Sequence, residues 1–164
     1  MVTTKLIDPN WKMPPLAKVY EALSAVVDNR VTLIGSDRAA VVSSSLDKSY
    51  TVEWSSDGKE ITSNDNASYW QGYIGYPIIA VFLSTGKIAY DKEAASSLAG
   101  IPWKQLNKQH KGNYDKAVAA VLESLEAKGT NIKAIADSAQ SIFDQLQRLD
   151  IKKYLSRRRP PPVS

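Results

Sequence analysis

The 164-residue sequence predicts a single α+β domain, and three observations lead to this fold class. Residues 30–63 hold short β-branched stretches separated by turn residues, which is typical of antiparallel strands. Beyond Gly86 the apolar residues recur at helical spacing. Between these parts lies the most apolar and aromatic stretch, from Ala67 to Tyr90, which we expect at the centre of the core.

The expected domain spans residues 1–155 in three parts. An N-terminal helix and a β-meander occupy 1–66, the central apolar element 67–90, and a helical half 91–155. The last nine residues, SRRRPPPVS (156–164), combine three arginines with a proline run. Prolines cannot continue a helix, and this segment offers no apolar area for packing, so we expect a disordered basic tail there.

The first helix is predicted in the run LAKVYEALSAVV, directly after Pro14 and Pro15. Its large apolar residues fall on one helical stripe, with Lys18 and Glu21 away from that stripe. This pattern is typical of a helix that buries one face. We expect the helix to end near Asp28.

Four β-branched segments then predict a four-stranded antiparallel meander, namely VTLIG, AAVVSSS, SYTVEWS and KEITS. In the third segment Tyr50, Val52 and Trp54 alternate with polar residues, so one face of the sheet should be packed and the other wet. Asp57-Gly58 is a strong signal for a tight turn before the fourth strand.

A buried central helix is expected over residues 77–85. Pro77 suits a first helical turn, because it loses no hydrogen bond there and already has a helical φ, and Gly86 suits a helix end. The residues between are too continuously apolar for an amphipathic helix, which predicts burial on nearly all sides. A strand is the alternative, since short apolar runs do not reveal their period.

The helical half is predicted as four helices. Asp91 can cap DKEAASSLA, Pro102 can begin PWKQLNKQH, YDKAVAAVLESLEAK follows Asn113, and Thr130 or Asn131 can cap the last helix. In that helix the apolar residues step by three and four, as in a heptad seam: Ile132, Ile135, Ala139, Ile142, Leu146 and Leu149. We expect this seam to pack against the preceding helix, with a dimeric coiled coil as the alternative.

Composition excludes several kinds of site. The chain has no cysteine, so disulfides, thiolate metal sites and cysteine nucleophiles are ruled out. His110 is the single histidine, which makes a zinc site or a serine triad improbable, and we expect neither metal nor cofactor. The N-terminal dozen residues lack the apolar core of a signal peptide, and the longest apolar run is short of a membrane span. We therefore expect a soluble, cytoplasmic protein.

Charge is unevenly distributed along the chain. Residues 1–100 carry 9 Lys/Arg against 11 Asp/Glu, a net charge of −2, whereas residues 101–164 carry 12 against 6, a net charge of +6. The overall net charge is +4. A basic C-terminal half favours an anionic partner there, and nucleic acid before membrane.

One segment of the basic half has the spacing of a known DNA-binding unit. Ser96 is a small residue four positions before Gly100, and the apolar Ile101 and Leu106 lie just after that glycine and six positions beyond it. The small residue lets two helices approach closely, and the glycine accepts a turn with positive φ. Residues 92–111 thus resemble helix-turn-helix DNA-binding proteins over about 20 residues.

The resemblance implies that the second helix of this segment enters the major groove of DNA. Glutamine is suited to adenine edges, and lysine to guanine or phosphate. The residues that would face the groove are Lys104, Gln105, Lys108 and Gln109. An ordinary helical hairpin is the alternative interpretation.

Two further groups of residues are candidates for binding. The aromatic cluster of Tyr69, Trp70, Tyr73 and Tyr76 suits a stacking platform for bases or a ligand pocket, although such clusters also form core with hydroxyls at the surface. The tail arginines would contact phosphates without reading sequence, or keep the chain end solvated. They are Arg157, Arg158 and Arg159.

The sequence therefore predicts a non-enzymatic binding protein whose partner is DNA or RNA, contacted by the basic helical half. The first alternative is a protein-interaction or dimerisation module that uses the seam of residues 132–149. The second alternative is a small enzyme with carboxylate or tyrosine chemistry around Asp65, Tyr69 and Tyr90.

Overall fold

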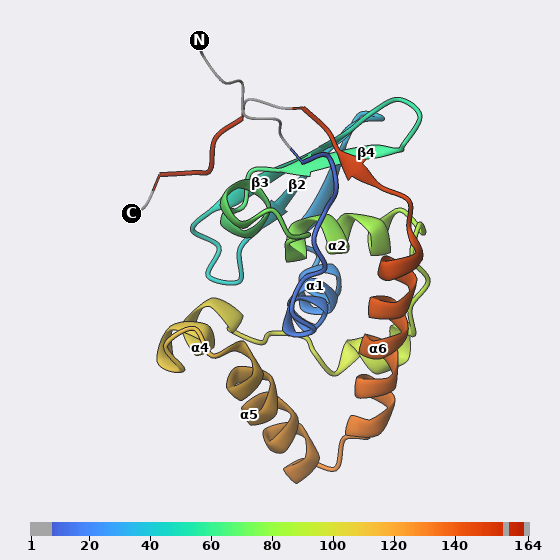
Figure 1. The fold of residues 1–164 in the computed structure, drawn as a ribbon. Helices are drawn as coiled ribbons and strands as arrows, with labels where there is room; N and C mark the ends of the chain where they lie inside the picture. The colour runs from blue at the N-terminus through green and yellow to red at the C-terminus, as the bar shows by residue number, and fades with distance from the viewer. Residues whose placement is uncertain (1–7, 156–157, 163–164) are drawn as a thin grey trace.

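The computed structural model describes residues 8–155 and 158–162 and has a mixed α+β fold (Figure 1). A five-stranded sheet forms one layer, and the helices lie together on one side of it. Helix α1 (Ala17–Val27) precedes the sheet along the chain, and most of the other helices follow it. The α+β class expected from the sequence is confirmed.

The sheet has the strand order β1-β2-β3-β4-β5. Its first four strands form the predicted antiparallel meander. They are β1 (Val31–Ile34), β2 (Arg38–Val42), β3 (Ser49–Trp54) and β4 (Glu60–Ser63). The packed face carries Ala39, Val41, Val52 and Ile61, all buried. In β3 the alternation is weaker than expected, because Val52 is buried but Tyr50 and Trp54 are half-buried, as are Thr51 and Glu53.

A fifth strand, β5 (Lys152–Lys153), was not predicted. It pairs in parallel with β4, opposite Glu60 and Ile61. The backbone N–H of Lys152 donates to the Lys59 carbonyl, and the N–H of Lys153 donates to the Pro9 carbonyl. Two lysines have no β signature of their own, so only these distant partners make the segment a strand.

Helix α2 (Tyr76–Ser84) is the predicted central helix. Pro77 lies in its first turn, and every residue from there to Leu83 is buried. The helix stops where Gly86 adopts a φ of +79°, a conformation that glycine accepts readily. α2 contacts α1 and strands β1 to β4, so it fills the space between the sheet and the other helices.

Helix α1 is buried far more completely than the sequence predicted. It contacts α2, α3, α5 and α6. Its polar residues Lys18 and Glu21 are buried along with its apolar stripe, although the pattern placed them away from the packed face. The reason is tertiary: the helices that follow the sheet return to cover the side of α1 that its own periodicity marks as polar.

Four helices follow α2, and each begins near its predicted cap. The side chain of Asp91 accepts from the N–H groups of Glu93 and Ala94, and Asn113 and Asn131 cap in the same way. The helices are α3 (Lys92–Ser96), α4 (Trp103–Gln109), α5 (Tyr114–Ala127) and α6 (Ile132–Arg148). None of the helices in the described residues is both long and apolar enough to cross a membrane.

The heptad-like seam of α6 packs inside the chain. Ile135, Ala139, Ile142 and Leu146 are buried. Besides α5, the helix expected to cover the seam, α6 contacts α1 and α3. The centre of the seam is therefore already covered within the chain.

Part of the basic tail lies against the domain. Arg158 Nε is 2.9 Å from Glu53 Oε1 on β3, and the Asn64 side-chain amide donates to the Arg159 carbonyl at 3.0 Å. These contacts differ from the free tail expected from composition, because a carboxylate and an amide of the domain offer polar partners that composition does not reveal. Arg157 lies outside the described residues.

We predict that Leu146→Ala lowers the free energy of unfolding by about 2–5 kcal/mol, the usual cost of emptying a buried leucine site. Leu146 is 2% exposed, whereas the control residue Leu155 is 81% exposed. Leu155→Ala should change stability by about 0.5 kcal/mol or less. Urea denaturation measures both. If Leu146→Ala leaves stability intact and converts a dimer to a monomer, the seam is an interface instead.

Candidate functional site

The segment with helix-turn-helix spacing forms two helices, but each packs elsewhere. α3 contacts α1 and α6, whereas α4 contacts α5. Trp103, at the start of α4, is buried, and its indole N–H donates to Ser24 Oγ at 2.8 Å. That hydroxyl in turn donates to the Leu98 carbonyl. This arrangement differs from the two-helix unit that the spacing predicted, because Trp103 anchors α4 to α1.

The four residues expected to face DNA do not share one environment. Gln105, Lys108 and Gln109 are exposed on α4. Lys104 instead reaches the β2–β3 turn, where its Nζ lies 2.7 Å from Asp47 Oδ2 and its backbone N–H donates to Ser44 Oγ. The hydrogen bond from Lys104 holds the pKa of Asp47 well below its usual range. Lys104 is therefore engaged by a carboxylate of its own chain.

The four residues of the aromatic cluster lie in different environments. Tyr69 and Trp70 are 37% and 72% exposed, with ring centroids 4.6 Å apart in an edge-to-face arrangement. Tyr73 and Tyr76 are half-buried, and Tyr76 meets Tyr50 edge to face at 6.3 Å. The first pair lies on the surface, and Tyr76 lines a cleft described below.

The exposed pair is held on η1 (Ala67–Gln71), a single turn of π-helix. Asp65 Oδ2 accepts from the Ser68 N–H, and Gly72 ends the turn with a φ of +73°. π-Helical turns occur often at functional sites, and this one projects two aromatic side chains outward.

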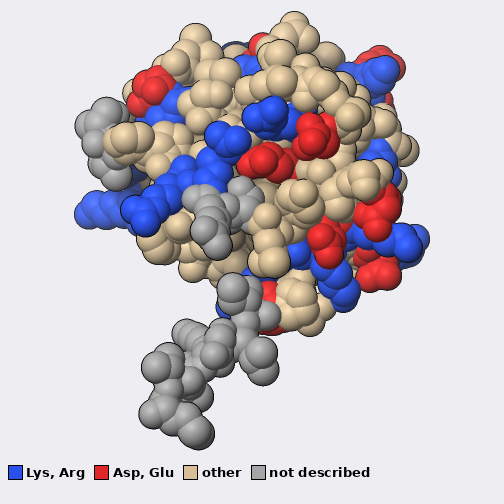
Figure 2. Space-filling model, turned by 90° about the horizontal axis from the view of Figure 1, so that it is seen from above, with Lys and Arg blue, Asp and Glu red and all other residues tan. Residues whose placement is uncertain are grey.

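Two lysines from distant segments flank η1. The Lys12 N–H donates to the Gly72 carbonyl, and the Lys12 carbonyl accepts from Ile74, which fixes the N-terminal arm beside η1. Lys153 Nζ lies 5.4 Å from the centre of the Trp11 ring, and a Cβ at Gly72 would be 3.2 Å from it. We call Lys12, Tyr69, Trp70 and Lys153 the aromatic–basic surface. Figure 2, seen from the sheet side, shows Lys and Arg side chains in a band on this side of the molecule, with acidic side chains beside it.

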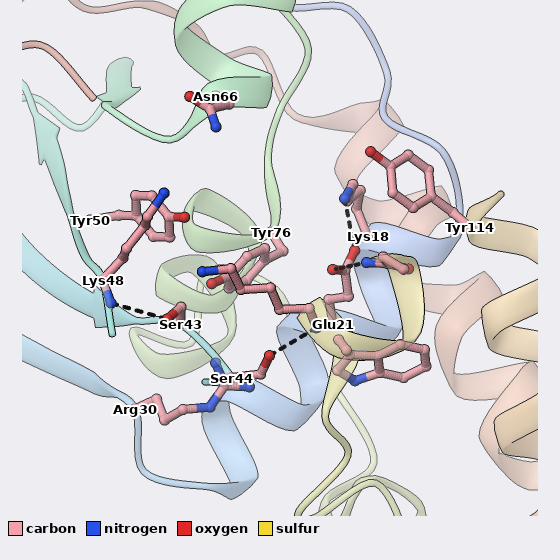
Figure 3. Close-up of a pocket in the computed structure, with 13 residues that line it drawn as sticks. Lys18, Glu21, Arg30, Ser43, Ser44, Lys48, Tyr50, Asn66, Tyr76 and Tyr114 are labelled. Atoms are coloured by element: carbon pink, nitrogen blue, oxygen red, sulfur yellow. Dashed lines mark hydrogen bonds and ion pairs between the residues drawn. The ribbon is translucent and has the colours of Figure 1, made fainter. Parts of the chain in front are cut away.

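A separate cleft of about 240 Å³ lies between α1, the β2–β3 turn, α2, α4 and the start of α5 (Figure 3). Its walls carry charged and phenolic groups that converge from segments far apart in sequence. They include Lys18, Glu21, Arg30, Lys48, Tyr50 and Tyr76. Apart from Tyr76, none of these six was a candidate from the sequence.

A buried ion pair forms one wall of the cleft. Lys18 Nζ and Glu21 Oε2 are 2.9 Å apart, with the two side chains only 10% and 8% exposed. The Asn107 amide donates to Glu21 Oε1 at 3.0 Å. Burial is the largest single influence on the pKa of Lys18 and lowers it, but the charge and the hydrogen bond of Glu21, with smaller contributions from Tyr114 and Tyr73, together raise that pKa, so Lys18 stays protonated.

The residues of the enzyme alternative are not brought together. Asp65 is buried beside η1, Tyr69 is on the surface, and Tyr90 lines a groove with Asp91 and α6. Asp65 Oδ2 accepts from η1, whereas Asp65 Oδ1 is buried without a hydrogen-bond donor among the described residues. Within residues 8–155 and 158–162, no group of three or more acidic or histidine side chains is placed to hold a metal ion.

The cleft went unrecognised in the sequence for a definite reason. Lys18 and Glu21 fit the polar side of an amphipathic helix, and only the fold buries them. One local signal was available, namely two opposite charges three residues apart in an otherwise apolar helix. Arg30, Lys48 and Tyr50 follow helix or turn boundaries and carried no such signal.

A family model of uncharacterised conserved proteins, UCP014422, matches residues 11–152. The chain belongs to this family. The match includes η1, the cleft and β5 up to Lys152. No curated protein and no solved structure matches the chain.

We predict that Gly75→Ala destabilises the protein by about 1–3 kcal/mol through overpacking. Gly75 has an ordinary extended backbone, but an added Cβ would overlap the Asp65 carboxylate. Asp65→Ala in the same chain should recover part of the loss, which a double-mutant cycle measures by urea denaturation. Ser84→Ala on the exposed end of α2 is the control. If Gly75→Ala has the same free energy of unfolding as the original chain, the close packing of Asp65 against Gly75 is contradicted.

Proposed function

We propose that this protein is a non-enzymatic binding protein for single-stranded nucleic acid, which it contacts through the aromatic–basic surface. The observation that carries the proposal is the exposure of Trp70 at 72% beside Tyr69. Large aromatic side chains usually lie inside, where they bury the most area. Two adjacent rings held outward by a rigid turn offer faces on which unpaired bases can stack.

The flanking charges support the same partner. The backbone of Lys12 is bonded to Gly72 and Lys153 Nζ lies beside Gly72, whereas Arg158 is paired with Glu53 on β3 and the Arg159 carbonyl accepts from Asn64. Phosphates along a single strand would meet these cations while its bases reach the rings. Because the contacts go to base faces and phosphates, the expected binding depends little on sequence.

Single strands are favoured over duplex DNA because of α4. A recognition helix needs its first turn free to enter the major groove. Here Trp103 is buried against α1, and Lys104 is bound to Asp47. The nucleic-acid interface is therefore proposed at η1, with the exposed Gln105, Lys108 and Gln109 left outside it.

We predict that Trp70→Ala weakens binding of a short single-stranded oligonucleotide by about 5- to 150-fold. This range corresponds to the loss of one stacked base, which contributes about 1–3 kcal/mol. Fluorescence anisotropy at about 50 mM salt measures the affinity. Leu33→Ala is the control, since Leu33 is also exposed but lies on β1. Absence of binding to single-stranded DNA and RNA alike would refute the proposal.

We further predict that replacing Lys12 and Lys153 together with glutamine lowers the slope of log affinity against log salt by about 1.4, since each phosphate contact to a single strand contributes about 0.7. The control Lys128→Gln, at the end of α5, should leave the slope unchanged. Titrations over a range of salt concentrations provide the measurement. If the slope responds to Lys108→Gln instead, and duplex DNA binds best, the interface is α4.

A further inference from the structure

We propose that the cleft between α1 and the β2–β3 turn binds a small organic molecule through an oxyanion group, either a phosphate or a carboxylate. This site is distinct from the aromatic–basic surface, because none of Lys12, Tyr69, Trp70 and Lys153 lines it. The inference rests on the charge, the hydrogen-bond donors and the size of the cleft.

Side chains of opposite walls face one another across the cleft. In Figure 3 Lys48 extends alongside Tyr50 on one side, and Lys18 and Tyr114 lie on the other, with Tyr76 between them. The walls come from α1, the β2–β3 turn, α2, α4 and the start of α5. The Lys104–Asp47 ion pair joins α4 to the β2–β3 turn.

The lining has a marked excess of positive charge. It carries four cationic side chains, Lys18, Arg30, Lys48 and Lys104, against the single carboxylate of Glu21. Lys18 is paired with Glu21, and Lys104 with Asp47 outside the lining. Arg30 Nε is 3.7 Å from Asp28 Oδ2. Among the residues that the structure describes, the Lys48 ammonium has no carboxylate partner, so it can receive an anion.

Arg30 adds a buried donor to the same cleft. Arg30 is 6% exposed, and its Nη1 donates to the Val42 carbonyl at 2.8 Å. The neighbouring Nε is buried and makes no hydrogen bond among the described residues, although Asp28 Oδ2 lies 3.7 Å away. A guanidinium with an unused donor binds an oxyanion well, because the hydrogen bond is assisted by charge.

Two phenols complete the set of donors. The hydroxyls of Tyr50 and Tyr76 have no hydrogen-bond partner among the described residues, although the two rings are in contact. Burial raises the pKa of both groups, so both hydroxyls keep their protons at neutral pH. Protonated phenols beside Lys48 would donate to an anionic oxygen without adding negative charge.

Size limits the occupant. A volume of about 240 Å³ lies just below the usual range for sites that take drug-sized ligands. A sugar phosphate or a dicarboxylate fits this space, and a folded polymer does not. Trp103 and Tyr114 also line the cleft and offer apolar surface to the carbon skeleton of such a molecule.

Isothermal titration of the full chain with inorganic phosphate and, separately, with succinate tests the proposal. We expect saturable binding of one probe or both, and a rise in melting temperature with probe concentration. Lys48→Gln should weaken that binding about tenfold or more, since it removes a charge-assisted contact. Lys59→Gln is the matched control, because Lys59 is an exposed lysine outside the cleft lining.

The outcomes separate the sources of the ligand. Binding of phosphate alone assigns a phosphate ester, and binding of succinate alone assigns a carboxylate, and both support the proposal. Tyr50→Phe, which keeps the ring and removes the hydroxyl, should weaken binding without unfolding the protein. The proposal is overturned if neither probe binds by about 10 mM. It is also overturned if Lys48→Gln binds as tightly as the unchanged chain.

Discussion

The rest of the structure depends on the burial of α1 on nearly all sides. α2 separates this helix from the sheet, and α3, α5 and α6 close around its remaining faces. Ser24 joins the layers, because its hydroxyl donates to the Leu98 carbonyl and accepts from the Trp103 indole. A helix in this position must satisfy its polar side chains internally, since an unpaired buried charge would be prohibitively costly.

That requirement accounts for the cleft. Lys18 and Glu21 neutralise each other, and Asn107 from α4 supplies a further donor to the carboxylate. Replacing such a pair with apolar residues is often neutral or stabilising, so a buried ion pair is weak evidence of a stabilising role. The Lys18–Glu21 pair lies in the wall of a cationic cleft, and charged groups with strongly altered environments gather at binding sites. This position favours a role in ligand binding.

The fold could be predicted where its signals are local. The meander follows from turn residues, and the helix starts follow from Asp91, Asn113 and Asn131, each acting within three residues of itself. The missed features all join distant segments. β5 forms because Lys152 and Lys153 pair with β4, and the cleft lies where α1, the β2–β3 turn, α2, α4 and the start of α5 come together. Of the candidate site residues, Tyr69 and Trp70 stayed together, since a single turn holds both.

Charge along the sequence also proved a poor guide to charge on the surface. The C-terminal half carries the excess of lysine and arginine, yet these residues do not form one basic face. Lys104 is bound to Asp47, Lys133 is paired with Asp137 on α6, and β5 returns two lysines to the sheet. The lysines near η1 thus come from both ends of the chain, Lys12 and Lys153. A single-stranded nucleic acid bound there would meet lysines from both halves of the sequence, because folding brings them together.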